Sequence, residues 1–247
     1  VSSNSKLTFL NFSSFIYRVF QKLYKSMSNN RRFGKGFLNT FSKLGLLYNF
    51  DPYFYQLKYD RFDGRDIFIF GYFQSESYFY SSKSDVMRLC KVCSKITEKE
   101  EFYLSKISNG PCIAVSLRLG YDYTHSDDLN VCDKAYYFDA ISKIVGLTGI
   151  KTLFIFSDEI DQAKMILNEM EYNDFVFEFI SDMDATQSLR LMYNCNHFVI
   201  SNSSFSWWGA YLSESKDKLI VGPDVWYNND VKAGDMFSKD IIRLKDL

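Results

Sequence analysis

In the second half of the chain, segments with the hydrophobic pattern of strands alternate with segments that have the pattern of helices. Short continuous apolar runs are separated by segments in which apolar residues recur with the period of an amphipathic helix. Strict alternation of this kind predicts an α/β fold with a parallel sheet, right-handed crossovers and helices on both faces. The predicted strands are 112–117, 152–156, 176–180, 197–201 and 219–221, and the predicted helices are 133–145, 158–170, 185–195 and 204–213, with Ser157, Asp184 and Ser203 as N-cap residues.

The first part of the chain has a less regular pattern. It predicts an aromatic amphipathic helix near 9–27, a polar basic stretch at 28–35, a short strand at 67–70 and a long helix at 84–105. The cleaner alternation begins at Pro111. We therefore predict two domains, 1–108 and 109–247, of which the second holds the parallel sheet.

The composition is that of a folded globular protein. Of the 247 residues, 47% are hydrophobic and 24% are charged, which excludes the disordered, collagen-like and coiled-coil classes. The 29 basic and 30 acidic residues leave a net charge of −1. No large field of one sign therefore points to a nucleic-acid partner.

Cysteine usage and the apolar segments bear on the compartment. The five cysteines are an odd number in a chain too long to need disulfides, so we expect reduced thiols and a cytoplasmic location. Cys90 and Cys93 are spaced as a metal or redox pair, but no second pair accompanies them, and we expect neither role. The apolar stretch at 7–20 is too short and too interrupted to span a membrane, which leaves peripheral contact with the inner membrane face as the expected alternative.

Several predicted strands end beside residues that could bind a ligand. In an open parallel sheet, ligands bind outside the carboxyl ends of the strands. An arginine, hydroxyl groups and a helix N-terminus at this edge suit a phosphate-bearing ligand. The candidates are Arg118, Ser157, Asp158, Ser181, Asp182, Asn202, Ser203, Ser204, Phe205, Ser206, Pro223 and Asp224.

Each of these motifs also has a structural interpretation. The stretch SNSSFSWWGA at 201–210 could form a helix cap followed by two core tryptophans. Arg118 could bind an anion or form a surface ion pair with Asp122 or Asp158. Asp158 and its neighbour Glu159 could simply favour the N-terminus of the next helix.

Other chemistries have weaker support. His125 and His197 have no nucleophile motif to partner them, so we expect neither to be catalytic. The Gly-Lys-Gly at 34–36 lacks the third glycine of a dinucleotide-binding loop, which argues against nicotinamide and flavin enzymes and against Walker-type nucleotide hydrolases. The Asp-Met-Asp at 182–184 lies between a strand and a helix, where capping is favoured over metal binding.

The string SNSSFSWWGAYL at 201–212 resembles the signature of bacterial α-1,2-fucosyltransferases, glycosyltransferase family 11. GYFQSE at 71–76 resembles the family segment GYFQSEKYF, and the segments 115–123 and 154–159 resemble its HxRRxD and FSDD blocks. The resemblance implies a GT-B-like fold of two Rossmann-like halves, of which the N-terminal half is incomplete here. It also implies GDP-fucose as donor, an oligosaccharide or glycolipid acceptor, inverting transfer to a galactoside hydroxyl, and no required metal or other cofactor.

The resemblance also suggests roles for individual residues. Arg118 would stabilise the charge that develops on the departing diphosphate, and Asp122 is the candidate for the base that takes the acceptor proton. The expected donor-binding residues are Ser116, Arg118, Ser157, Asp158, Asn202, Ser203, Ser204, Phe205 and Ser206.

The chain departs from the family pattern at several positions. Ser116 and Leu119 replace the histidine and the second arginine of HxRRxD, and Ser188 stands where an aspartate is expected. The family's Gly-rich GGLGNQ loop is not found in these residues, so we expect either a start downstream of that loop or a shortened relative. Two alternatives to fucose transfer therefore stay open: a catalytically silent glycan- or nucleotide-binding relative, and a transferase of another GDP-sugar.

Overall fold

The computed structural model describes residues 46–49, 68–170, 174–228 and 236–247. Two compact units are distinguished: Val1–Asp51 with Tyr55–Phe73, and Pro52–Phe54 with Gln74–Leu247. In the first unit, β1 (Leu46–Asn49) and β2 (Phe68–Gly71) form a parallel pair. Strand β2 confirms the strand predicted at 67–70, whereas the predicted helix at 9–27 and the stretch at 28–35 lie outside the described residues.

The second unit contains a six-stranded sheet in which every pair of neighbouring strands is parallel. The strand order is β5-β4-β3-β6-β7-β8. This sheet confirms the predicted α/β class. Its strands are β3 (Ile113–Leu117), β4 (Thr152–Ser157), β5 (Val176–Phe179), β6 (His197–Val199), β7 (Ile220–Gly222) and β8 (Ile241–Arg243), of which β8 was not predicted.

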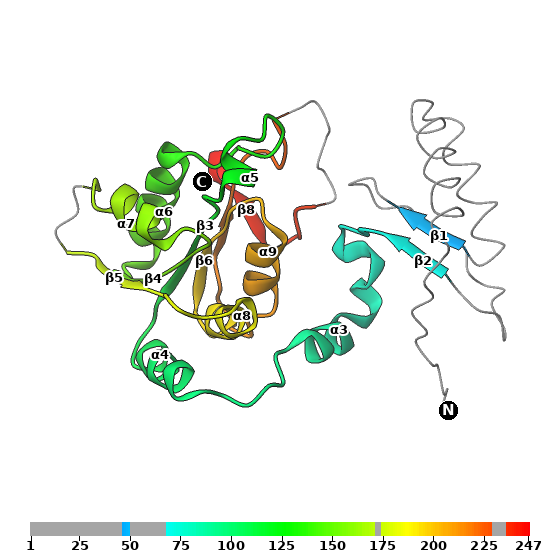
Figure 1. Cartoon of the computed structure of the whole chain (residues 1–247), viewed down its shortest axis with the longest axis horizontal. Helices are drawn as coiled ribbons and strands as arrows, with labels where there is room; N and C mark the ends of the chain where they lie inside the picture. Colours follow the sequence, from blue (N-terminus) through cyan, green and yellow to red (C-terminus); the bar gives the residue numbers. More distant parts are fainter. Residues whose placement is uncertain (1–45, 50–67, 171–173, 229–235) are drawn as a thin grey trace. The chain divides into compact units, whose positions relative to one another are not determined.

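Helices cover both faces of this sheet (Figure 1). One face is packed by α6 (Lys134–Thr148) and α7 (Ile160–Leu167). The other face is packed by α4 (Glu98–Ser108), α8 (Ala185–Tyr193) and α9 (Ser204–Tyr211). The unit also contains three short 3-10 helices, Glu76–Tyr78, Tyr80–Ser82 and Leu244–Asp246, the single-turn helix α5 (Tyr121–Thr124) and the helix α3 (Lys83–Cys90).

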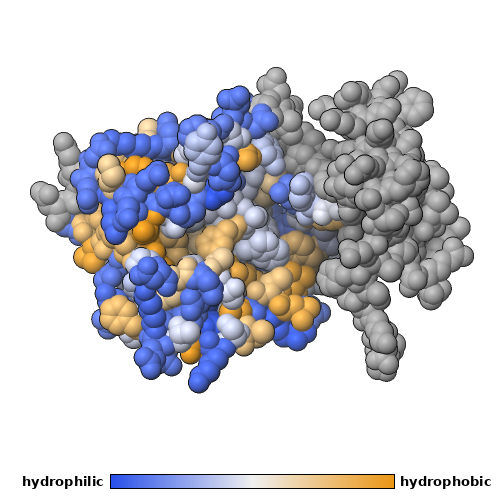
Figure 2. All heavy atoms as spheres, in the orientation of Figure 1, coloured by the Kyte–Doolittle hydropathy of each residue, from blue (hydrophilic) through white to orange (hydrophobic). Residues whose placement is uncertain are grey.

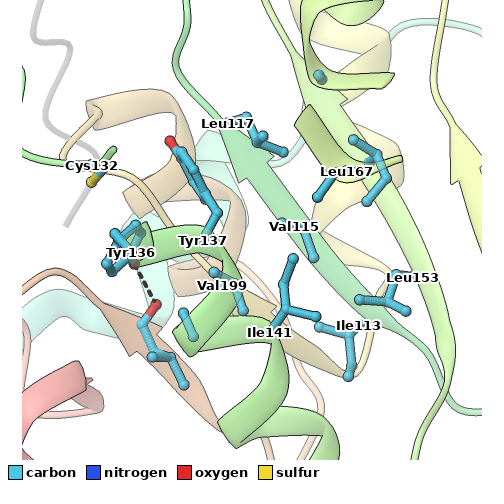
Figure 3. Packing of buried hydrophobic residues seen from close by; sticks show 14 of the residues in the cluster. Ile113, Val115, Leu117, Cys132, Tyr136, Tyr137, Ile141, Leu153, Leu167 and Val199 are labelled. Atoms are coloured by element: carbon cyan, nitrogen blue, oxygen red, sulfur yellow. Dashed lines mark hydrogen bonds between the residues drawn. The ribbon is translucent and has the colours of Figure 1, made fainter. Parts of the chain in front are cut away.

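Successive side chains of β3 point to opposite faces of the sheet and so belong to two hydrophobic clusters. Ile113 and Val115 belong to the cluster that includes Tyr137 and Ile141 of α6, while Ala114 belongs to the cluster of the opposite face. Figure 3 shows the first cluster, with the α6 side chains directed toward β3. A strand that is buried on both faces must be apolar throughout, which explains the continuous run at 112–117.

The helix predicted at 84–105 is two helices. The first, α3 (Lys83–Cys90), has no buried residue, and residues 91–97 separate it from α4. Thr97 and Glu100 form a capping box that starts α4, because each side chain bonds the backbone N–H of the other. Helix α4 packs within the second unit. The predicted boundary lies at 108, but residues 74–108 also belong to this second unit.

The predicted N-caps had mixed outcomes. Asp184 caps α8 in a capping box with Gln187, as predicted. Ser203 occupies the N-cap position of α9, but its side chain makes no capping bond. Ser157 is wrong as a cap, because it is the last residue of β4 and its hydroxyl accepts from Glu159 N before α7 begins.

The surface of the second unit mixes polar and apolar residues. Figure 2 shows hydrophilic residues along the margins of the visible face and more hydrophobic residues across its middle. Within the described residues, no helix has both the length and the apolar character needed to cross a membrane. All five cysteines are free thiols, with Cys90 and Cys93 exposed and the other three buried.

Candidate functional site

The strand order places the two main sequence motifs side by side. The chain runs from β3 outward through β4 to β5 and then returns to β6 on the other side of β3. This reversal is a topological switch point, and in open α/β sheets ligands bind outside the carboxyl ends of the strands at such a point. Arg118 directly follows β3, and 201–206 comprises the end of the link after β6 and the first turn of α9, so both lie at this edge of the sheet.

The guanidinium of Arg118 lies between two carboxylates. Nη1 donates to Asp158 Oδ2, and Nη2 donates to Asp122 Oδ2 at 2.5 Å. The Arg118 side chain is 31% exposed, and its backbone N–H donates to the hydroxyl of buried Tyr137 at 3.1 Å. The predicted ion pairs with Asp122 and Asp158 are therefore both formed, with the charge still open to solvent.

Asp158 organises the loop after β3 as well as the arginine. Its two carboxylate oxygens accept from Leu119 N at 2.8 Å and from Gly120 N at 2.9 Å. A Cβ atom at position 120 would come within 2.6 Å of Asp158 Oδ2, so glycine allows this close approach. The sequence motif did not reveal this role, because it depends on contacts between segments far apart in the chain.

Ser206 lies in a buried chain of hydroxyl groups. Its Oγ is 2.7 Å from Ser116 Oγ and 2.9 Å from Ser201 Oγ, and each of these three residues is at most 4% exposed. The chain links β3, the end of β6 and α9. The geometry favours a role for Ser116 and Ser206 in holding the two motifs together, whereas contact with a ligand at these positions stays a prediction.

Asn202 is also used for internal bonds. Its Oδ1 accepts from Tyr123 Oη at 2.6 Å, and its Nδ2 donates to the carbonyls of Leu129 and Trp226 at 2.9 and 2.8 Å. The Tyr123 hydroxyl accepts from the backbone N–H of Cys132 at 3.0 Å. Asn202 therefore ties the loop after β3 to the segment after β7.

Burial favours the neutral forms of the groups around Asn202. It raises the pKa of Tyr123, and it raises the pKa of Cys132 to about 12. Both groups therefore stay protonated at neutral pH. His197, at the start of β6, has its pKa lowered by burial, and its Nδ1 accepts from Leu219 N at 3.1 Å. This internal bond agrees with the structural role expected for His197.

Within the described part of the chain, the N-terminus of α9 has no side-chain cap, as is also the case for α3, α5 and α7. The first N–H groups of any helix have no intrahelical acceptor, and they are usually bonded by the N-cap side chain. Thr97, Asp133 and Asp184 provide this bond in α4, α6 and α8, but Ser203 does not provide it in α9. Ser204 is exposed on the first turn and Phe205 is partly buried against the core. This end of α9 can therefore accept an anion.

The tryptophans of the motif pack against other aromatic rings of the second unit. Phe79 stacks on Trp208 with ring centroids 5.7 Å apart, and Trp207 stacks on Tyr211 at 4.4 Å. Trp207 Nε1 also donates to Met236 O at 3.0 Å. Both tryptophans pack against other aromatic rings but are only partly buried, so the interpretation of them as core residues is wrong.

Carboxylates elsewhere at this edge have structural partners. Asp184 caps α8, which confirms the predicted capping role, and Asp182 is paired with Lys99 at 3.1 Å. In the described ranges, no group of three or more His, Cys, Asp or Glu side chains is placed to hold a metal ion.

Replacement of Ser206 by alanine is expected to lower the free energy of unfolding by about 1–3 kcal/mol, because Ser116 and Ser201 then lose a buried partner. Ser204→Ala is the matched control on the same helix. Its side chain is exposed, so its effect should stay within about 0.5 kcal/mol. Urea denaturation of both variants measures the difference, and equal effects would contradict the assigned role of the hydroxyl chain.

Comparisons with known proteins agree with this geometry. The sequence profile of glycosyl transferase family 11 matches residues 15–244. Alpha-1,2-colitosyltransferase of Escherichia coli is 26% identical over 198 residues, which cover 78% of this chain and 68% of that protein. The O-antigen biosynthesis glycosyltransferase WbnK of the same organism is 26% identical over 174 residues, which cover 67% of this chain and 57% of that protein.

Solved structures give more distant matches. POFUT1 in complex with GDP-fucose matches with a TM-score of 0.43 and 19% identity, covering 65% of this chain and 55% of that chain. The ADP-heptose heptosyltransferase II of E. coli matches with a TM-score of 0.40 and 13% identity, covering 60% and 44%. The family profile extends over most of the sequence, and the protein therefore belongs to glycosyl transferase family 11.

Proposed function

We propose that this glycosyltransferase takes L-fucose from GDP-fucose and transfers it, with inversion, to a hydroxyl of a glycan acceptor. The observation that carries the proposal is that Arg118 and the uncapped N-terminus of α9 follow the neighbouring parallel strands β3 and β6 at the switch point of the sheet. A guanidinium and backbone donors at one edge of a sheet suit the two phosphates of a nucleoside diphosphate.

The reaction needs charge stabilisation more than covalent help. As the bond between the sugar and the β-phosphate breaks, negative charge develops on GDP, and a fixed arginine stabilises that charge more in the transition state than in the ground state. The contact with Asp158, which would hold the Arg118 guanidinium at this edge of the sheet, supports this role. Ser204 and the first-turn N–H groups of α9 would bind the remaining phosphate oxygens. Because Arg118 supplies positive charge, we propose that no metal is required.

The names of two relatives support a glycan acceptor, since one is named for O-antigen biosynthesis and the other for α-1,2 transfer of colitose. From the family resemblance of the motif at 201–212, we propose a galactose-containing oligosaccharide or glycolipid as acceptor. In this proposal, residues after 109 hold the donor and earlier residues help to build the acceptor side. Colitose is the second donor sugar to test, because a relative is named for it.

A donor screen tests the proposal. GDP and GDP-fucose are expected to raise the melting temperature, because a ligand that binds only the folded state stabilises it by about 2.7 kcal/mol at 100 times its dissociation constant. GDP-mannose tests specificity for the donor sugar, and UDP and UDP-sugars test specificity for the nucleotide's guanine base. Stabilisation by UDP in the absence of any effect of GDP would refute the proposed donor.

A further inference from the structure

The two carboxylates that hold Arg118 differ in how firmly they are themselves held. Asp158 is 26% exposed and is fixed by two backbone N–H donors in addition to the guanidinium. Asp122 is 70% exposed and lies on the single-turn helix α5. Within the described residues, its side chain forms no other hydrogen bond than the one from Arg118. Asp122 is therefore the partner that can leave.

A bound diphosphate would compete for the nitrogen that Asp122 occupies. Ion pairs between exposed side chains are weak, because water screens the charges and two flexible side chains must be ordered. A diphosphate carries more negative charge than one carboxylate and can accept two parallel hydrogen bonds from a guanidinium. Asp158 would remain in place, since it also holds Leu119 and Gly120.

We propose, on the basis of the proposed function, that donor binding displaces Asp122 from Arg118 and that the freed carboxylate becomes the general base of the transfer. In the reaction, the acceptor oxygen forms a bond to C1 of the sugar while the C1–O bond to the β-phosphate breaks. The electron pair of that bond leaves with GDP, and the acceptor hydroxyl proton moves to the Asp122 carboxylate.

This arrangement couples the base to the donor. Without a donor, the Asp122 carboxylate is paired with Arg118 and is not available to the acceptor hydroxyl. With the donor bound, the guanidinium faces the diphosphate and the carboxylate is released beside the reacting centre. The displacement therefore favours an ordered reaction, in which the donor binds before the acceptor is activated.

Asp122→Asn separates this role from a purely structural one. Loss of the competing carboxylate should tighten GDP binding about two- to fivefold, measured by isothermal titration calorimetry. The same variant should release GDP from GDP-fucose at least about 100-fold more slowly than the wild type, with a galactose-terminated oligosaccharide as acceptor. Tighter binding together with slower turnover is not expected from a damaged site.

Two further variants complete the test. Asp158→Asn should weaken GDP binding, because the arginine and its loop lose their fixed anchor. Asp127→Asn changes an exposed carboxylate a few residues further along the same loop and should leave GDP affinity and turnover unchanged. Unchanged or weaker GDP binding by Asp122→Asn, or unchanged turnover, would overturn the proposal. Absence of GDP binding by the wild type would instead overturn the proposed function.

Discussion

Arg118→Ala is expected to lower kcat by about 100- to 1,000-fold, the usual loss when one charge-assisted contact to a developing anion is removed, equivalent to about 3–4 kcal/mol. The effect should fall at least as strongly on kcat as on donor binding, because the charge on the departing diphosphate is greatest in the transition state. Steady-state kinetics with GDP-fucose, together with GDP titration, separate the two contributions.

Folding should survive this substitution. The Arg118 side chain is partly exposed, and Asp158 keeps its two backbone donors when the guanidinium is gone. Arg118→Lys should recover little activity, because an ammonium cannot bind two phosphate oxygens in the parallel geometry of a guanidinium. Arg88→Ala, which removes an exposed arginine paired with Asp85 on α3, is the control for loss of a surface charge. An Arg118→Ala enzyme with near-normal kcat would exclude the assigned role.

The strands and helices around the site could be predicted because their apolar residues recur with clear strand and helix periods. The ends of the five predicted strands shift by no more than two residues, since each run is mostly apolar and is followed by polar or turn residues. Strand β8 was missed because it is short, lies at the sheet edge and is only partly buried. The break between α3 and α4 was missed because apolar spacing continues through it, while the capping box at Thr97 starts a new helix.

For the site, the sequence pattern predicted the positions of the motifs but not their packing partners. The position of Arg118 and of 201–206 followed from the strand ends, and the structure places them on adjacent strands. The sequence could not distinguish exposed Ser204 from buried Ser206, because hydroxyl groups on one helical turn look alike until the packing partner is known. The sequence predicted that Asp158 contacts the donor. Its bonds to the backbone N–H groups of Leu119 and Gly120 show that it also fixes the loop after β3.

A residue within a family-like block can also be structural. Arg190 lies in 189–192, a stretch that also resembles the family pattern ahead of the motif at 201–212, yet its side chain is only 5% exposed and its Nη1 donates to Glu100 Oε1 at 2.6 Å. Its Nη2 donates to Ser94 Oγ at 2.9 Å. The Glu100 side chain is 1% exposed, and the pair joins α8 to α4 on one face of the sheet. This ion pair therefore holds α4, which precedes the first strand of the six-stranded sheet, against α8.

The charge state of Glu100 makes this contact sensitive to acid. Burial opposes ionisation, but hydrogen bonds from Thr97 and the Arg190 charge outweigh it and lower the pKa of Glu100. A lowered pKa in the folded state adds stability above the ordinary pKa of a glutamate. That contribution is lost as the pH falls through the folded-state pKa.

Arg190→Ala is expected to lower the free energy of unfolding by about 3–5 kcal/mol, because it leaves the Glu100 carboxylate buried without its cation. Lys99→Ala, which removes one partner of the exposed pair with Asp182, should change it by less than about 1 kcal/mol. Replacing both buried partners, Arg190→Met with Glu100→Leu, should recover most of the loss, since no unpaired charge then remains in the core. Urea denaturation at neutral pH measures all three, and a loss for Arg190→Ala no larger than that for Lys99→Ala would show that the buried pair does not hold α4 against α8.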